Sequence, residues 1–390
     1  MKYDLKTEEM FRIIPEDLEV HAMNRYCVKC GNPLEEGAKF CNHCGNEVYI
    51  PHPQQRANNV NEGFFDRFID RINGMTGEQG EADIKLKELF SQTFKKHKDV
   101  EKELLYVSGM SFTTPEEKDM LSQWPSPWLY GRVFLSLGVV FAGLWVMVEI
   151  FGNAIAVPGL IFIGALLVPF SLSIFFWEVN VPRNISIFDC VRFFFVGGVL
   201  SLVSTSIVYA VIGDLANISV IGAFFVGFAE ELGKAVISIY YAKKFNSKYV
   251  LNGLLIGACV GAGFAVFETA GYLFLYALQV GIVDMLELLY VRSFFSVGTH
   301  LMWTAIVTAA FVSVKQDKAF NISMIGNKKF IRFFLIAVLL HALWDMPFAG
   351  RLLYSALSTI AIIIVLVMIS AGLRQISRVV NQANRTGYYS

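Results

Sequence analysis

The feature that most constrains the fold of this chain is a series of apolar stretches, each about 20 residues long, between residues 133 and 373. An α-helix needs about 20 mainly apolar residues to cross the hydrocarbon core of a bilayer. Residues 129–390 hold only 17 basic and 11 acidic residues among 262, whereas about a quarter of a soluble domain is charged. We therefore expect an all-α polytopic membrane protein with a soluble region before it.

Eight apolar stretches are present, and they predict a bundle of about eight transmembrane helices. They cover approximately residues 133–151, 157–178, 187–212, 219–242, 250–276, 293–314, 330–349 and 353–373. The stretch 277–292 lies between the fifth and the sixth. It is expected to be a longer outer loop, with a re-entrant or surface helix as the alternative.

The basic residues predict the orientation in the membrane. Residues 1–26 contain no signal peptide, so the N-terminus is expected in the cytoplasm, and an even number of spans returns the C-terminus there. The predicted inner segments then hold twelve Lys and Arg residues, and the outer ones hold two, Arg292 and Arg351. This agrees with the positive-inside rule. The expected location is the cell membrane, multi-pass, with both termini cytoplasmic.

Four cysteines near the N-terminus form two CxxC pairs separated by ten residues, Cys27 with Cys30 and Cys41 with Cys44. Four thiolates at this spacing hold Zn²⁺ tetrahedrally with no open position. The sequence CVKCGNPLEEGAKFCNHCGN also resembles the short bacterial zinc-ribbon family. Disulfides are the alternative, which a reducing cytoplasm disfavours. We expect one structural zinc ion.

The chain is expected to have six parts. They are an N-terminal segment (1–26), the zinc ribbon (27–48), a linker (49–63), a cytoplasmic or juxtamembrane helical region (64–128), the membrane domain (129–375) and a cytoplasmic tail (376–390). Apolar residues in 64–72 and 82–106 recur at helical spacing. These amphipathic helices are expected to pack on each other, with docking to the bilayer surface as the alternative.

Several ionisable residues lie deep inside predicted spans, where they are costly and therefore functional candidates. At ~1.5 Å per residue, the acids and histidines fall in the outer half of the bilayer or at its middle. This shared depth favours a single site. The set is Glu230, Glu231, Lys234, Glu268, His300, His341 and Asp345.

Helical spacing indicates which way these residues face. Small residues at Gly253, Gly257 and Gly261 recur every four positions and predict close helix packing. Glu268 continues that stripe and is expected to face the bundle interior. His341 and Asp345 are four positions apart, so the carboxylate can hold the imidazole N–H.

The lysine in the fourth span can neutralise one of two glutamates. Lys234 lies four positions after Glu230 and three after Glu231, and both spacings allow contact on a helix. The other glutamate would stay free. From the residues alone the buried cluster fits a hydrolase, an ion or proton translocator, or a structural polar network.

Four motifs in order narrow these alternatives. They are EExxK (Glu230 to Lys234), FxxxE (Phe264 to Glu268), the lone intramembrane His300, and HALWD (His341 to Asp345). Over roughly residues 130–375 they resemble the PrsW family of intramembrane proteases. That family is akin to the type II CAAX prenyl endopeptidases and the glutamic intramembrane proteases.

The resemblance implies cleavage of membrane-anchored proteins, including anti-sigma factors in regulated bacterial signalling. By the same resemblance Glu230 would activate water, and Glu231 would pair with Lys234, although the two glutamates can exchange roles. The histidines would stabilise the oxyanion or bind water. Glu268 would hold water or donate a proton, with Asp345 orienting His341 and Phe264 in support. CAAX enzymes have a histidine in the second motif and an asparagine-like residue after the last histidine, so the division of roles is open where this chain has Glu268 and Asp345.

Other functions stay open at this point. A second zinc ion held by the glutamates and histidines would make the site a metalloprotease, although the sequence lacks HExxH. A membrane sensor or transporter could use the same cluster, but no internal repeat typical of transporters is evident. An inactive relative acting as a scaffold is a further alternative. The expected partners are the bilayer and single-span membrane proteins, with a homo-oligomer left open and no nucleic acid.

Overall fold

The computed structural model describes residues 42–43, 64–78, 80–121, 123–213 and 219–386. The chain divides into two units at residues 62 and 63, and the fold described below is that of the second. All four cysteines of the predicted ribbon, and the linker 49–63, lie outside the described residues. The regular elements of the described part are all helical, which confirms the predicted all-α polytopic class.

Among the described residues, six helical stretches are long and apolar enough to cross a membrane. They comprise α4 (Leu129–Glu149), η3 with α5 (Ala154–Ala156 and Val157–Val179), α6 to α7 (Ile187–Arg192, η4 Phe193–Gly197, Gly198–Ile212), α9 (Val250–Gln279), α10 to α11 (Ile282–Phe295, η6 Ser296–Gly298, His300–Lys315) and α13 (Arg351–Thr386). The sequence predicted about eight. The other two predicted spans correspond to α8 (Val220–Lys244) and α12 (Lys328–Trp344).

Both exceptions have a physical reason. Helix α8 carries three charged side chains within one turn, and α12 is only 17 residues long. These two helices carry three of the acids and histidines that the sequence analysis selected, Glu230, Glu231 and His341, and Asp345 is the C-cap of α12. The ionisable side chains, which are costly to place inside a membrane, are therefore concentrated on the helices that hold the candidate site.

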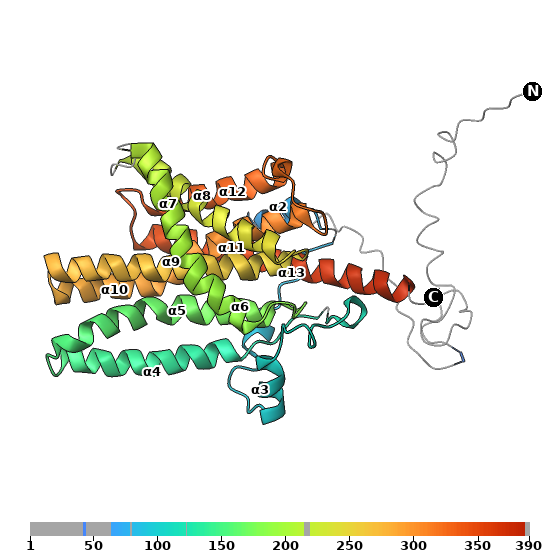
Figure 1. The fold of residues 1–390 in the computed structure, drawn as a ribbon, viewed down its shortest axis with the longest axis horizontal. Coiled ribbons are helices and arrows are strands. Elements are labelled where there is room, and N and C mark those ends of the chain that lie inside the picture. The colour runs from blue at the N-terminus through green and yellow to red at the C-terminus, as the bar shows by residue number, and fades with distance from the viewer. Residues whose placement is uncertain (1–41, 44–63, 79, 122, 214–218, 387–390) are drawn as a thin grey trace, which may run out of the picture. The chain divides into compact units, whose positions relative to one another are not determined.

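Helix α9 forms the centre of the bundle, and its residues from Val250 to Val266 are all buried. Figure 1 shows α4 and α5 side by side along one side of α9, with α8 and α12 on the other. The predicted glycine stripe lies against α11. A Cβ atom at Gly257 would be 2.4 Å from the Thr304 carbonyl oxygen, and one at Gly261 would be 2.4 Å from that of His300. Only glycine permits this approach.

Most of the stretch 277–292 is α10, so the expected outer loop is wrong and the alternative of a helix is nearer to the structure. Helix α9 extends to Gln279, and Gly281 makes the turn with a φ of 126° that favours glycine. Helix α10 then runs back with Met285 and Leu289 fully buried. A short 3₁₀ turn, η6, links it to α11. The consequence is that Arg292, expected in a loop, lies on a helix packed against α9.

A π-helical turn interrupts the third span. This turn, η4, separates α6 from α7 and packs against the middle of α9. A Cβ atom at Gly263 would lie 1.8 Å from the Phe194 carbonyl oxygen, and one at Gly198 would lie 2.6 Å from the carbonyl carbon of Gly263. Paired glycines therefore bring the two backbones into direct contact at the turn.

The amphipathic segments depart from their predicted packing. Helix α2 (Phe64–Thr76) packs along α13, where Arg374 donates to the side-chain oxygen of Asn73 and to the Glu81 carbonyl at 2.7 Å. The segment 82–106 is broken at Lys98, which is extended, so it forms only η1 (Glu88–Phe90) and α3 (Asp99–Tyr106). The remaining short turns are η2 (Glu117–Asp119) and η7 (Ile322–Met324).

Candidate active site

Two glycines on α8 set the distances between the helices that carry the candidate site. A Cβ atom at Gly227 would lie 2.9 Å from the Ala342 nitrogen of α12, and one at Gly233 would lie 2.2 Å from the hydroxyl of Thr205 on α7. Helix α8 is thus held closely between α7 and α12. Glu230 and Glu231 lie between these two contacts, so their carboxylates reach side chains of both neighbours.

Glu231 is fixed by two charge-assisted contacts to one oxygen. Its Oε1 is 2.6 Å from Lys234 Nζ and 2.8 Å from His341 Nδ1. The Glu231 and Lys234 side chains have no exposed surface. A buried carboxylate requires such partners, because an unpaired charge in a low-dielectric interior is very costly.

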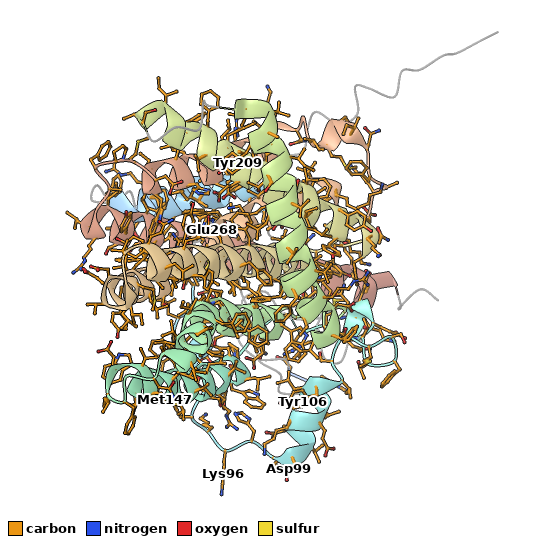
Figure 2. The ribbon with its side chains drawn as sticks, turned by 60° about the vertical axis from the view of Figure 1, so that its left-hand side comes forward. Lys96, Asp99, Tyr106, Met147, Tyr209 and Glu268 are labelled. Carbon is orange, nitrogen blue, oxygen red and sulfur yellow. The ribbon has the colours of Figure 1, made fainter. Side chains whose placement is uncertain are left out.

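Glu230 is held at one oxygen and open at the other. Its Oε1 accepts a hydrogen bond from the hydroxyl of Tyr209, which Figure 2 labels, at 3.0 Å. Its Oε2 is buried and has no hydrogen-bond partner among the described residues. That oxygen lies 3.5 Å from His341 Nε2, 3.6 Å from Lys234 Nζ and 3.9 Å from His300 Nδ1. Glu230 therefore presents one carboxylate oxygen to both histidines.

His300 is oriented by a cation on one side and an anion on the other. Lys234 Nζ is 2.8 Å from its Nδ1, and Glu268 Oε2 is 3.1 Å from its Nε2. Since an ammonium can only donate, Nδ1 accepts and the proton is assigned to Nε2, which donates to Glu268. Arg292 holds the same glutamate oxygen at 2.6 Å and also donates to Thr269 at 3.1 Å.

His341 lies between acids at both ring nitrogens. Besides the Glu231 contact at Nδ1, its Nε2 is 3.3 Å from Asp345 Oδ2. Trp303 covers the ring face at a centroid distance of 4.6 Å. An imidazolium here would donate on both sides, so His341 can supply a positive charge or a proton.

The two aromatic side chains next to Lys234 enclose its ammonium group. Lys234 Nζ is 4.4 Å above the Phe264 ring and 5.9 Å from the Trp303 ring. Both rings are buried. The rings exclude solvent and stabilise the cation through cation–π attraction. Phe264, which was expected to support the site, therefore contacts Lys234 directly.

Residues 187–372 match the protein-family model described as PrsW family intramembrane metalloprotease. The chain carries a PrsW-family domain. A zinc-ribbon domain is matched over residues 26–48. Neither the curated proteins nor the solved structures give a match. The PrsW domain supports a membrane protein that hydrolyses peptide bonds within the membrane.

The PrsW domain brings together all six predicted acids and histidines, with Lys234 and Phe264 beside them. The six are Glu230, Glu231, Glu268, His300, His341 and Asp345. They form one continuous set of contacts across α8, α9, α11 and α12. Their catalytic roles, and the expected water-containing cavity, stay predictions.

Sequence reasoning missed three residues of the PrsW site. Tyr209 and Arg292 contact Glu230 and Glu268, and Trp303 packs on both histidines. Arg292 was an available signal, since it is a lone basic residue in a predicted outer stretch. Trp303 lies one turn after His300. Tyr209 offered no signal, because its partner is on another helix.

The PrsW site also suits a divalent metal in the kind and spacing of its donors. One ligand atom each from Glu230, His300 and His341 lies within 4.8 Å of the others, and all three residues are buried. The Glu230 oxygen without a partner is a ready ligand, and one carboxylate with two imidazoles is a common catalytic zinc set. However, Lys234 already contacts His300 Nδ1 at 2.8 Å, so metal binding there would displace this ammonium.

Proposed function

We propose that this protein is an intramembrane endopeptidase in which Glu230 activates water to cleave membrane-anchored proteins. The observation that carries the proposal is the buried Glu230 Oε2, which has no hydrogen-bond partner in the described part and faces both histidines. A general base must lie within reach of a water that can attack a carbonyl. The PrsW-family domain supports the same reaction class.

The contacts support different proposed roles for the two glutamates. Glu231 shares one oxygen between Lys234 and His341, which lowers its ability to take a proton. Both glutamates leave Oε2 without a hydrogen-bond partner in the described part. Glu230 differs because its hydrogen bond comes from the neutral Tyr209 hydroxyl, and its contacts to His341, Lys234 and His300 are longer, at 3.5 to 3.9 Å. We therefore assign the base to Glu230, and Glu231 positions Lys234 and His341.

In the proposed reaction, Glu230 removes a proton from water as the oxygen attacks the scissile carbonyl carbon. The Nε2–H of His341, which lies beside Glu230 Oε2, is the nearest donor for the oxyanion that forms. The Nε2–H of His300 already donates to Glu268. The proton held by Glu230 then passes to the leaving amine as the C–N bond breaks. The products are a carboxylic acid and an amine, which become a carboxylate and an ammonium when the acid proton passes to the amine, so atoms and charge balance.

Glu268 receives a positioning role in this scheme. Arg292 and His300 both contact its Oε2, so the carboxylate fixes the imidazole tautomer rather than binding water freely. Asp345 acts in the same way on His341 at 3.3 Å. Carboxylates that orient histidines commonly set tautomer and basicity.

A metal-dependent form of the reaction is the second candidate, favoured by the family description and by the donor set. Glu230, His300 and His341 would hold the ion, and a bound zinc would polarise the carbonyl and acidify water. Metal content separates the two forms. Full-length protein with Cys27, Cys30, Cys41 and Cys44 changed to Ser should purify without zinc in the metal-free form. In the metal-dependent form, the same protein should retain one zinc per chain. The further change His341→Ala should then remove that zinc.

The proposed substrates are single-span membrane proteins, because the site is buried among helices at a common height. Glu230, His300 and His341 lie 13 to 15 residues from the ends of α8, α11 and α12 that face the basic side, which is ~20 Å at 1.5 Å per residue. Anti-sigma factors are one class to test. If the basic end is cytoplasmic, cleavage falls in the outer half of the bilayer.

The test uses purified full-length protein in liposomes with a panel of single-span membrane proteins. Glu230→Gln keeps size and hydrogen bonding but removes the base, so cleavage should fall about 10²- to 10⁴-fold. Glu149→Gln, on the exposed end of α4, is the matched control and should retain activity. Equal loss in both variants, or full activity in Glu230→Gln, would reject the assignment.

A further inference from the structure

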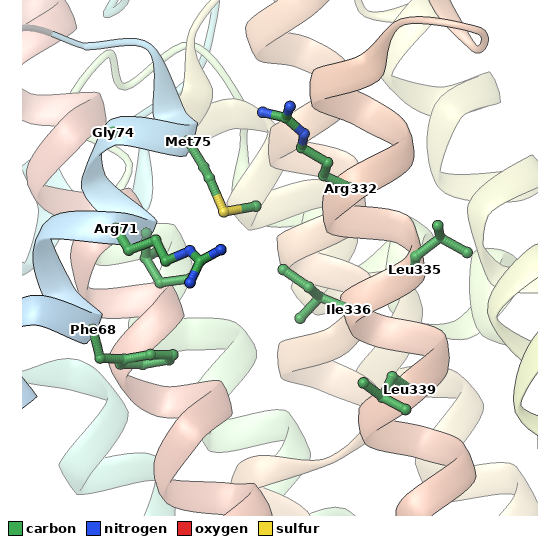
Figure 3. Close-up of a pocket in the computed structure, with 9 residues that line it drawn as sticks. Phe68, Arg71, Gly74, Met75, Arg332, Leu335, Ile336 and Leu339 are labelled. Carbon is green, nitrogen blue, oxygen red and sulfur yellow. The ribbon is translucent and has the colours of Figure 1, made fainter. Parts of the chain in front are cut away.

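A pocket of about 840 Å³ lies between α2 and α12, on the side of α12 away from the candidate active site. The lining residues that matter below are Phe68 and Arg71 of α2 and Arg332, Leu335, Ile336 and Leu339 of α12. Figure 3 shows the Arg71 and Arg332 side chains extending toward the space between the two helices. Neither the catalytic scheme nor the family match assigns this pocket a role.

The two arginines that line the pocket are both exposed. Arg71 and Arg332 make no hydrogen bond or ion pair with any described residue, and no acid of the described part lines the pocket. By contrast, Arg351, Arg374 and Arg378 each contact a carboxylate or another oxygen acceptor. Two guanidinium groups at one pocket therefore create a site for an anion.

The basic side chains and the apolar wall of the pocket are arranged as the headgroup and the acyl chain of a lipid would require. Arg332 is four residues from the start of α12 and Leu339 is eleven, which correspond to ~6 Å and ~16 Å along the axis. Arg332 thus lies near the basic end of the bundle, and Figure 3 shows Arg71 farther along the wall, beside Ile336. The apolar wall continues toward the middle of the bundle. Leu335 and Leu339 are about half exposed, at 50% and 51%, so the pocket is open along its apolar length.

We propose that this pocket binds one phospholipid with an anionic headgroup, from the leaflet at the basic end of the bundle. The headgroup phosphate lies between Arg71 and Arg332, and an acyl chain follows Phe68, Ile336 and Leu339. Anionic lipids are attracted to basic residues at the membrane surface, and the apolar wall adds contacts that a soluble anion could not use. The lipid would tie α2 to the membrane domain, independently of proteolysis.

The experiment measures lipid binding on the full-length protein in detergent, titrated with phosphatidylglycerol or phosphatidylcholine. Bound lipid is counted by native mass spectrometry, and unfolding temperature is followed in parallel. The test variant is Arg71→Gln with Arg332→Gln. The matched control, Arg67→Gln with Lys318→Gln, also removes two positive charges, from exposed positions outside the pocket.

Wild type and control should retain one phosphatidylglycerol in preference to phosphatidylcholine and gain unfolding temperature from it. In the test variant its apparent Kd should rise about 30-fold, since each basic residue contributes about 1 kcal/mol at an anionic surface. Leu339→Trp should weaken the same lipid by filling the wall without changing charge. Unchanged binding in the test variant, equal loss in the control, or equal retention of both lipids would overturn the proposal.

A photo-crosslinker at Ile336 identifies the occupant directly in vesicles containing phosphatidylglycerol. Crosslinks to lipid are expected. Crosslinks to residues 1–63 would show that the acidic N-terminal part of the chain fills the pocket, and crosslinked dimers would show a second copy. Either result would replace the lipid.

Discussion

Replacing Gly261 by Ala should damage the site through the spacing of α9 and α11. The new Cβ atom would lie 2.4 Å from the His300 carbonyl oxygen, 2.7 Å from the Thr304 hydroxyl and 2.9 Å from Thr304 Cβ. Ordinary contact begins at 3.4 Å, so the two helices must separate by about 1 Å. Overpacking of this kind costs about 1–3 kcal/mol of stability.

The separation carries His300 away from the helix that bears Glu268. Their present 3.1 Å contact would lengthen to about 4 Å, beyond hydrogen-bond distance. A displacement of about 1 Å in a catalytic group can lower a rate about 10²-fold. We therefore expect Gly261→Ala to lose both stability and most cleavage.

The assay compares thermal unfolding of purified protein with cleavage of a substrate identified in the liposome panel. The control is Gly271→Ala on the same helix, where a Cβ atom meets nothing within 4 Å. It should keep full activity and gain up to about 1 kcal/mol from helix propensity. If Gly261→Ala behaves like Gly271→Ala, close packing of α9 and α11 does not position His300.

Four further outcomes are expected. Tyr209→Phe should lower the cleavage rate about tenfold with little change in stability, as measured in the liposome assay, because it removes one hydrogen bond to Glu230. Arg292→Gln should lower both activity and unfolding temperature, since Glu268 loses its closest cation. Purified wild-type protein should contain one ribbon zinc per chain in the metal-free form, and a chelator that removes it should leave the circular dichroism of the membrane helices unchanged. Finally, hydrogen bonds from Lys248, and to a smaller extent from Tyr249, lower the pKa of Glu117. Wild type should therefore be more stable than Glu117→Gln above about pH 5. This difference should be lost as the pH falls below the ordinary glutamate pKa of about 4.3.

The transmembrane helices were predictable because bilayer thickness fixes a length of apolar sequence. The same rule misread 277–292, where three charged residues, Asp284, Glu287 and Arg292, interrupt the apolar pattern. That helix is stabilised by packing on α9 and α5, which local sequence does not report. Helix α2 was found by its periodicity, but its partner α13 lies nearly 300 residues away in the chain.

The candidate site was predictable for a different reason. Carboxylates and imidazoles inside a membrane need one another, so shared depth and the glycine stripe were enough to expect that Glu268 and His300 would meet. Contacts such as Tyr209 with Glu230 depend on the rotation of one helix about its axis. A hydroxyl in an apolar span has no comparable cost, so its role becomes visible only in three dimensions.

The π-helical turn at Phe193–Gly197 has a consequence for insertions and deletions in this chain. Such a turn contains one residue more than an α-helical turn. The wider turn absorbs this extra residue, so deleting one residue there would restore regular winding and leave the helix that follows in nearly the same phase. Tyr209, twelve residues later, would still face Glu230. Deleting one residue from the regular part of α7 instead would rotate Tyr209 by about 100° and turn it away from Glu230, although every residue of the four motifs would be unchanged. The phase of the third span is thus part of the site, and the π-helical turn is the one place where a single-residue deletion should leave the hydroxyl contact in place.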